Sequence, residues 1–180
     1  MKRRQLTKPI TDPGAIDEIN SWLSRLSRES DSAAAVLAGA FIDAALESLL
    51  RTFCVDDSKE ADNLFDADQP LGSFGARIRT AYLLGFITPT ERDDLRRIKD
   101  VRNAFAHSFH ELAFDDEPVK SWCQSLKTGR DLLEHAVQPN SRARFSHAAA
   151  LIAARLAGRV HDIAHARREL LGEGMDPRGA

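Results

Sequence analysis

The chain has 180 residues, of which 43% are hydrophobic and 29% are charged, and its formal net charge is -2. This length and composition suit one globular domain with its own core and exclude a chain that is disordered throughout. A protein that binds mainly by neutralising nucleic-acid phosphates usually carries an excess of positive charge, which this chain as a whole lacks. We therefore expect no sequence-specific DNA binding.

The cysteines and the apolar runs indicate the kind of compartment. Cys54 and Cys123 lie far apart, within apolar stretches and in no ligand spacing, so we expect buried thiols rather than a disulfide framework or a metal site. The basic start, residues 1–4, is not followed by the apolar segment of a signal peptide. The longest apolar run, residues 33–42, is about half of what a bilayer crossing requires. The sequence predicts a cytoplasmic protein with no membrane span, metal or cofactor.

The first two predicted elements are helices. Asp12–Pro13 predicts a cap and a first helical turn, and the apolar residues that follow at helical spacing are Ile16, Ile19, Trp22, Leu23 and Leu26. The second helix is expected from Asp31 or Ser32 to about Phe53. Its first half is apolar all round, which predicts burial on most sides, and its small residues allow a neighbouring helix to approach closely.

Residues 54–70 are strongly acidic and are predicted to form a connecting loop, anchored by Leu64 and Phe65. A third helix follows Pro70–Gly75, with an inner face of Ile78, Ala81, Tyr82 and Leu84, and it should stop at Gly85. Thr88, Pro89 and Glu91 predict a capping box and the start of a fourth helix that runs to Ala106 or His107.

The last third of the chain is expected to contain a loop and two further helices. The loop is residues 108–116. The fifth helix starts at residues 116–118 and carries Val119, Trp122, Cys123, Leu126, Leu133 and Val137 inward. The last helix runs from about Arg144 to Leu171, with Phe145, Ala149, Ile152, Leu156, Val160 and Ile163 inside, and its face is rich in arginine.

No stretch shows the alternating pattern of a strand, so the predicted fold is all-α, a single-domain bundle of about six helices. We expect residues 1–137 to form the bundle, residues 138–171 to form a basic helix that packs on it or extends it, and residues 172–180 to form a disordered tail.

One segment carries recognisable chemistry. On a wheel of about 100° per residue, Arg102, Asn103 and His107 lie on one polar edge beside the buried stripe of the fourth helix. An arginine can hold a phosphate while a histidine moves a proton. This Arg-x4-His spacing resembles the motif of the HEPN (higher eukaryotes and prokaryotes nucleotide-binding) family of helical ribonucleases, in which two copies meet to form one site. The spacing also occurs at Arg130/His135 and Arg142/His147, so by itself it is weak.

Three blocks together resemble the mannitol operon repressor family. They are Asp31–Ala35, which opens the second helix, Pro70–Gly85, and Asp100–His107 followed by Phe114–Asp116. The resemblance covers residues 30–137. It implies a compact helical regulator that binds another protein or pairs with itself, and it does not imply a DNA-reading helix.

Two functions remain open from the sequence. The first is a non-catalytic regulator that acts through protein–protein contacts, as a homodimer formed by the small-residue helix or by the Arg102/His107 edge. Its binding or interface residues would be Arg102, Asn103, His107, Arg77 and Arg79. The second is a metal-independent ribonuclease, with RNA as its partner and Arg102, Asn103 and His107 as its catalytic residues.

Overall fold

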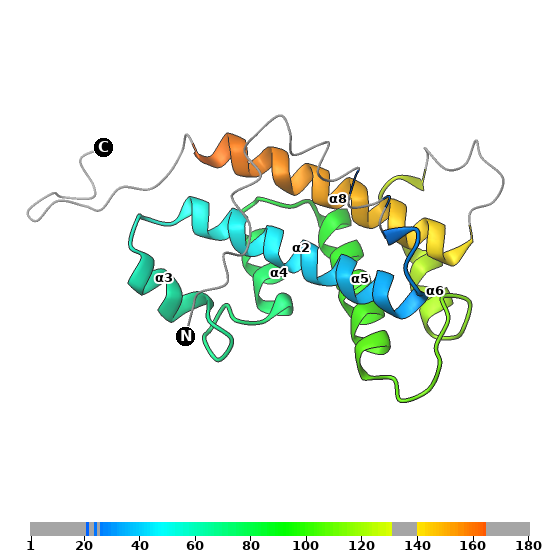
Figure 1. Cartoon of the computed structure of the whole chain (residues 1–180). Helices are drawn as coiled ribbons and strands as arrows, with labels where there is room; N and C mark the ends of the chain where they lie inside the picture. The colour runs from blue at the N-terminus through cyan, green and yellow to red at the C-terminus, as the bar shows by residue number, and fades with distance from the viewer. Residues whose placement is uncertain (1–20, 22–23, 25, 131–139, 165–180) are drawn as a thin grey trace, which may run out of the picture.

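The computed structural model of the chain describes residues 21, 24, 26–130 and 140–164. This part contains six helices and no strand, which confirms the predicted all-α bundle (Figure 1). The helices are α2 (Asp31–Phe53), α3 (Ser58–Phe65), α4 (Phe74–Leu83), α5 (Pro89–His107), α6 (Val119–Ser125) and α8 (Ser141–Ala164).

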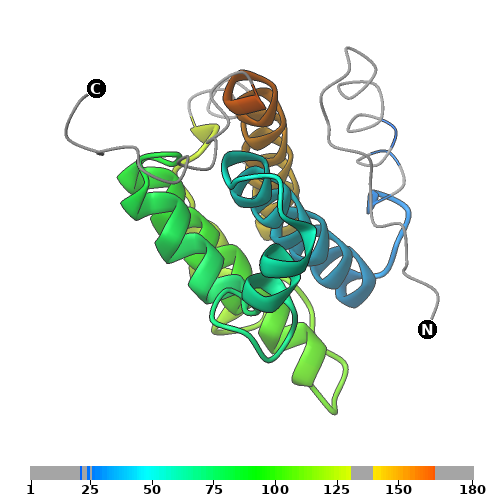
Figure 2. The same cartoon turned by 90° about the vertical axis from the view of Figure 1, so that its left-hand side faces the viewer.

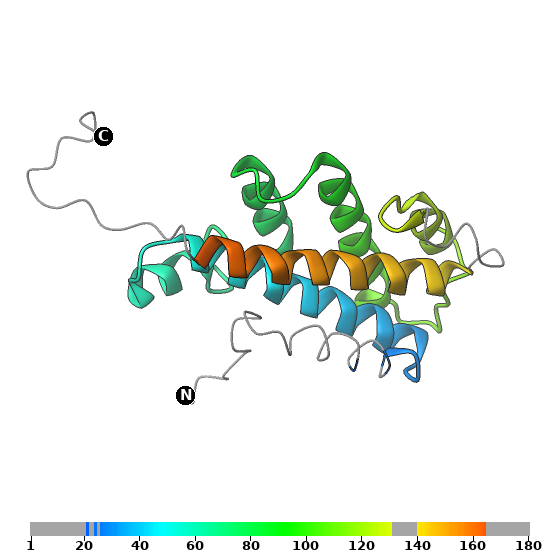
Figure 3. The same ribbon diagram turned by 90° about the horizontal axis from the view of Figure 1, so that it is seen from above.

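The two long helices, α2 and α8, form the spine of the bundle. They lie side by side and run in the same direction, as Figures 1 and 3 show. Helices α4 and α5 pack against one side of this pair (Figure 2), and α6 packs against α5 and α8. Every described helix except the short α3 therefore contributes an extensive contact to one shared core.

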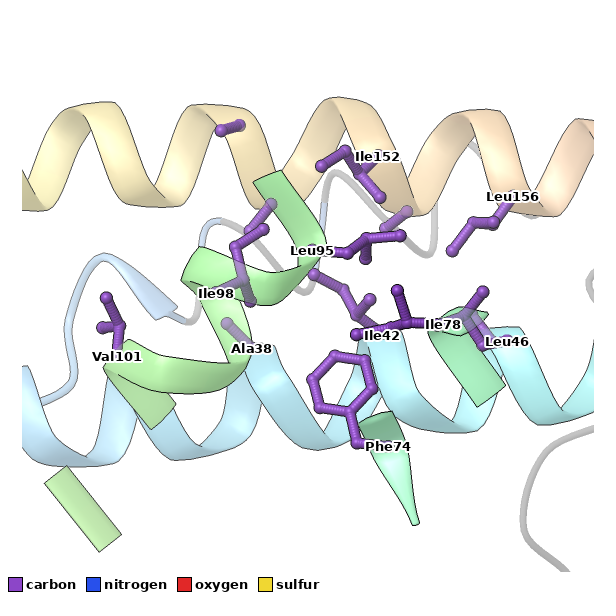
Figure 4. Packing of buried hydrophobic residues seen from close by; sticks show 14 of the residues in the cluster. Ala38, Ile42, Leu46, Phe74, Ile78, Leu95, Ile98, Val101, Ile152 and Leu156 are labelled. Carbon is purple, nitrogen blue, oxygen red and sulfur yellow. The ribbon is translucent and has the colours of Figure 1, made fainter. Parts of the chain in front are cut away.

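The core lies where α2, α4, α5 and α8 face one another (Figure 4). The side chains of α5 predicted to be buried are buried, namely Leu95, Ile98, Val101 and Phe105, and so are Phe145, Ala149, Ile152, Leu156 and Val160 of α8. Alanines of α2 and α8 keep these two helices close together, as the small-residue pattern predicted, and they include Ala34, Ala35, Ala38, Ala148, Ala149 and Ala153.

Side-chain caps set the helix starts. The Oγ1 atom of Thr88 accepts a hydrogen bond from the Glu91 N–H, and the Glu91 carboxylate accepts one from the Thr88 N–H, so the predicted capping box is confirmed. Ser30 caps α2 and Ser73 caps α4 in a similar way. The predicted stop after α4 is also confirmed, because Gly85 has a φ of 77°, a conformation that glycine adopts without strain.

The acidic stretch predicted to be a loop contains the helix α3. The carboxylate of Asp57 accepts hydrogen bonds from the N–H groups of Lys59 and Glu60, both at 3.1 Å. An acidic residue at this position satisfies free N–H groups and suits the positive end of the helix dipole, so the acidic composition favoured a helix start here. The two predicted anchors are confirmed, because Phe65 is buried and Leu64 packs against the core.

The prediction of one continuous helix from residue 116 to residue 137 was wrong. Helix α6 ends at Ser125, and the buried carboxylate of Asp94 accepts hydrogen bonds from the N–H groups of Lys127 and Thr128. These bonds from α5 take up backbone donors that a continuing helix would use in its own ladder. Two of the predicted inward residues, Leu133 and Val137, lie outside the described residues.

One predicted burial was wrong. Leu84 is 46% exposed because it follows the last turn of α4. The first half of α2 is buried on most sides, as predicted, and its exposed side carries Leu37, which is 46% exposed. Helices α8, α5 and α4 cover the other sides of α2, and no element of the described part contacts it more extensively than these three. The predicted first helix, apart from the buried Leu26, and the tail lie outside the described residues.

Helix α2 is long and apolar enough, by length and composition, to cross a membrane. Half of its most apolar window is buried inside the bundle. Its polar stripe of Asp43, Glu47 and Arg51 forms ion pairs with neighbouring side chains of the bundle. These contacts indicate the central helix of a folded bundle rather than a membrane span.

Helix α8 begins three residues before the predicted start, because the side-chain oxygen of Asn140 accepts a hydrogen bond from the Ala143 N–H at 2.8 Å. Several arginines of its predicted basic face are used inside the fold. Arg155 and Arg159 donate to the buried Oε1 atom of Glu91, at 3.4 Å and 3.0 Å. Glu91 therefore joins the start of α5 to α8 while it also completes the capping box.

Candidate functional site

The polar edge predicted to carry the chemistry lies along the second half of α5. Arg102 and Asn103 are half-buried, and the Arg102 guanidinium donates a hydrogen bond to the Asn103 side-chain oxygen at 3.0 Å. His107 is exposed at the last residue of the helix. The structure thus brings Arg102 and Asn103 together and leaves His107 further along the same helix, in contact with solvent.

Arg102 packs closely against α2 at Gly39, because glycine has no side chain there. A Cβ atom built on Gly39 would lie 2.5 Å from Cγ and 2.7 Å from Cβ of Arg102, so only glycine permits this crossing. The Nε atom of Arg102 is buried and has no hydrogen-bond partner among the described residues. The positive charge of Arg102 also acts on Asp43, one turn further along α2. Arg102 is therefore partly a packing residue and not a free surface cation.

Arg77, predicted to be a binding or interface residue, lies inside the bundle. Its side chain is 9% exposed, and its guanidinium contacts Asp43 at 2.8 Å and Glu47 at 2.7 Å. It also donates to the carbonyl oxygens of Leu71 and Phe65. Because these partners occupy the guanidinium, we leave Arg77 out of the candidate site.

Burial raises the pKa of Asp43, although the neighbouring Arg77 and Arg102 act in the opposite direction. The buried cation of Arg77 therefore favours the charged form of Asp43 and opposes the effect of burial. This part of the molecule is a structural ion-pair cluster.

Arg79, two residues after Arg77, is exposed on α4. It lies one turn before Leu83, which is 81% exposed, so the outward side of α4 carries a cation and an apolar side chain together. Next to them the guanidinium of Arg92 from α5 lies 4.5 Å above the ring of Tyr82. We call these four residues the α4–α5 end.

The other Arg-x4-His pairs have different surroundings. Arg142 donates to the Asp31 carboxylate at 2.7 Å and links the starts of α8 and α2. The Nε2 atom of His147 is buried without a partner in the described part of the chain. Arg130 donates to a backbone carbonyl, and His135 lies outside the described residues.

A loop that the sequence reasoning did not single out presents the most exposed aromatic side chain of the described residues. Phe109 is 100% exposed, two residues after the end of α5. The segment from residue 108 to residue 117, which we call the Phe109 loop, contains four acidic residues and no lysine or arginine: Glu111, Asp115, Asp116 and Glu117. The sequence signal for this loop is an aromatic residue shortly after a predicted helix, in a segment with acids and no lysine or arginine, although this pattern does not show which of its two phenylalanines is exposed.

The base of the Phe109 loop is fixed to the bundle. Phe114 is buried, and its ring lies 5.0 Å from that of Phe105 and 5.1 Å from that of Phe145. Its backbone N–H donates to the Asp31 carboxylate at 3.0 Å, the same group that binds Arg142. The tip of the loop is therefore exposed while its second half is anchored in the core.

A hollow of about 620 Å³ lies between the Phe109 loop and the start of α2. Its floor is apolar, formed by Phe105 and Leu112, and Asp31, His110 and Glu111 contribute polar atoms to its lining. Arg102, Asn103 and His107 do not line this hollow. The described residues contain no cluster of three or more His, Cys, Asp or Glu side chains placed to bind a metal ion. The hollow suits an apolar or cationic side chain of a partner better than an anion.

A chain of the X-ray structure of the MtlR–HPr complex from Escherichia coli has a similar fold. The TM-score is 0.51, the sequence identity is 21%, and the match covers 81% of this chain and 98% of that chain. At this identity the likeness concerns the fold. No family model matches the chain, and no curated protein sequence matches it. The resemblance to the mannitol operon repressor family is thus supported at the level of fold, and the resemblance to the HEPN motif stays a sequence-based prediction.

Proposed function

We propose that the chain is a non-catalytic regulator that acts by binding another protein through the Phe109 loop. The observation that carries the proposal is the position of Phe109, fully exposed on a loop whose base is anchored in the core. Aromatic side chains are frequent anchors of protein interfaces. A partner that covered Phe109 would remove its ring from water, which is favourable.

The charge of the loop indicates the chemistry of the partner. Phe109 lies between Ser108 and His110, and the loop that follows it contains four acids and no lysine or arginine. The complementary surface therefore carries lysines or arginines beside an apolar pocket. HPr is the protein found with MtlR in the similar structure, so an HPr-type protein is the first candidate. A cytoplasmic location belongs to the same proposal.

Titration calorimetry of the full chain with Escherichia coli HPr tests this proposal. We expect binding that weakens when the salt concentration rises from about 50 to about 300 mM, because opposite charges face each other. Phe109→Ala should weaken binding about tenfold or more, as the loss of an interface anchor does.

Leu37→Ala is the matched control, since Leu37 is an exposed apolar residue of α2. It should bind HPr like the wild type. Absence of HPr binding would remove HPr as the candidate. Equal binding by the wild type and by Phe109→Ala would remove the Phe109 loop as the site.

A metal-independent ribonuclease is the second candidate, favoured by the hydrogen-bonded Arg102 and Asn103 beside an exposed histidine. Single-stranded RNA incubated with the purified chain in EDTA should then be cleaved, and His107→Ala should abolish cleavage while the helical circular dichroism is unchanged. Intact RNA after incubation with the wild type rejects this candidate.

A further inference from the structure

We propose that two copies of the chain pair face to face along α5 in antiparallel orientation. In this pair, the Phe109 loop of each copy lies on the α4–α5 end of the other. The proposal requires no other protein, so it does not rest on the function proposed above. Because an HPr-type protein would cover the same Phe109 loop, it would compete with the second copy, and the test below therefore uses the chain alone. It rests on the way in which charge and exposed apolar side chains are distributed along one helix.

The two ends of α5 are complementary in charge. Near its start, Arg79 of α4 is exposed, and Arg92 and Arg96 of α5 lie 2.7 Å and 3.9 Å from the carboxylate of Asp93. This acid neutralises only part of the charge, so the surface keeps an excess of positive charge. Beyond its end, the Phe109 loop contains four acids and no lysine or arginine. Opposite charges on two surfaces favour their association, and like charges oppose the arrangement in which equal ends meet.

Each end also exposes one large apolar side chain. Leu83 is 81% exposed at the α4–α5 end, and Phe109 is 100% exposed on the Phe109 loop. Covering such side chains favours association wherever a partner can reach both. The two residues lie at opposite ends of α5, a helix of 19 residues and roughly 28 Å. A parallel pair would cover each of them with its own copy but would also bring like-charged ends together, so an antiparallel pair satisfies the apolar contacts and the charges at once.

The middle of α5 fits the same arrangement. A two-fold axis beside residue 98, the midpoint of the helix, places Arg96 opposite Asp100 of the second copy, and Asp100 opposite its Arg96. Asp100 is 33% exposed and pairs with Lys99 at 3.0 Å, and Arg96 is 51% exposed and lies 3.9 Å from Asp93. Both side chains are exposed enough to add a partner from the second copy to these contacts. The contact is self-complementary, which closes the assembly at two copies and prevents open chains.

The outward side of α5 is available for this contact. Within the described part of the chain, α5 packs on α2, α4, α6 and α8 through its other sides. The exposed stripe of α2 around Leu37 is the other surface on which a homodimer could form, but it lacks the complementary charges that fix the orientation of α5. The α5 face therefore fits a second copy better.

Sedimentation of the full chain, from about 5 to about 200 µM, tests the proposal. The wild type should shift from monomer to dimer over this range. Arg96→Asp alone and Asp100→Arg alone should each weaken the dimer about tenfold, because each places like charges together at two symmetric positions. The double variant, with both charges exchanged, should restore the dimer, since opposite charges face each other again.

Leu83→Ser and Phe109→Ser remove the apolar contacts and should leave a monomer over the same range, whereas Leu37→Ser, the matched control on α2, should dimerise like the wild type. Circular dichroism checks that each variant is folded. A wild type that stays monomeric at the highest concentration overturns the proposal. So does a dimer that is insensitive to Leu83→Ser and Phe109→Ser, or a dimer that the double charge exchange fails to restore.

Discussion

The charged residues of the bundle interior differ from those of the Phe109 loop in what surrounds them. Inside, Arg77 lies between Asp43 and Glu47, and Glu91 accepts hydrogen bonds from two arginines of α8. In the loop, the four acidic side chains and the ring of Phe109 are exposed, although Asp115, Asp116 and Glu117 also accept hydrogen bonds from nearby groups. The same residue types are therefore enclosed by the fold in one region and reach solvent in the other. Mutation should separate the two roles.

Arg77→Met should have the largest effect on stability. It removes the cation from a cluster in which Asp43 and Glu47 are partly buried, so the free energy of unfolding should fall by about 3 kcal/mol. Urea unfolding followed by circular dichroism measures this change. Arg79→Met, two residues away on the exposed side of α4, is the control and should change stability by less than about 0.5 kcal/mol. Similar values for the two variants would contradict the structural role of Arg77.

Glu91→Ala should lower the free energy of unfolding by about 2 kcal/mol. It removes half of the capping box and leaves Arg155 and Arg159 without their buried partner. Glu91→Gln keeps an acceptor for the Thr88 N–H, so its free energy of unfolding should fall by less than that of Glu91→Ala. If both variants are as stable as the wild type, this link between α5 and α8 contributes nothing.

Gly39→Ala should destabilise the bundle by about 1–2 kcal/mol, because the new Cβ collides with the Arg102 side chain. The double variant Gly39→Ala/Arg102→Ala removes the nearest colliding atom. The free energy of unfolding should therefore fall by less in the double variant than by the sum of the decreases in the two single variants. Additive losses in a double-mutant cycle would show that the two residues do not press on each other.

Acid should change stability through Glu91 and Asp43 in opposite directions. Burial opposes ionisation of Glu91, but hydrogen bonds from Thr88 and Arg159 outweigh it and lower its pKa. Its contribution is therefore full above the ordinary range of carboxyl groups and is lost as the pH falls through the lowered pKa. Burial raises the pKa of Asp43 in spite of Arg77, so its contribution is full in acid and is lost as the pH rises through the raised pKa.

Urea unfolding between about pH 3 and about pH 7 separates these two groups. Glu91→Gln should flatten the loss of stability in acid, and Asp43→Asn should steepen it. Curves that keep the wild-type shape in both variants would show that neither carboxylate controls the response to acid.

Phe109→Ser and Glu111→Gln should have the smallest effects on folding. Both side chains are exposed, so the free energy of unfolding should change by less than about 0.5 kcal/mol in either variant. The same unfolding experiment checks this. A loss near that of Arg77→Met would mean that the Phe109 loop is part of the structural region.

The sequence predicted the parts of the fold that follow from local patterns. The capping box at Thr88, the stop at Gly85 and the buried stripe around Ile98 each depend on residues close together in the chain, and all three are confirmed. The break after α6 was missed because its cause, the carboxylate of Asp94, belongs to another helix. A contact between distant segments leaves no periodic pattern in the sequence.

The candidate site was predictable only in part. The helix wheel placed Arg102, Asn103 and His107 on one polar edge, but it could not show that Gly39 brings Arg102 against α2 while His107 is exposed. The burial of Arg77 could not be predicted from the sequence either. Its partners Asp43 and Glu47 belong to α2, which is distant from Arg77 in the chain. Phe109 was missed because its loop also contains Phe114, and only the fold shows that Phe114 is buried while Phe109 is exposed.

The hydrogen bond that anchors the Phe109 loop to Asp31 affects how the loop can bind a partner. The carboxylate of Asp31 accepts hydrogen bonds from both Phe114 and Arg142. Much of the conformational entropy that a flexible loop would lose on binding a partner is therefore already lost when the chain folds. Only the few residues around Phe109 still lose conformational freedom when a partner binds. Such preorganisation allows a small contact area to give useful affinity. Asp31→Ala removes the acceptor that holds the loop, so it should weaken binding although Phe109 itself is unchanged.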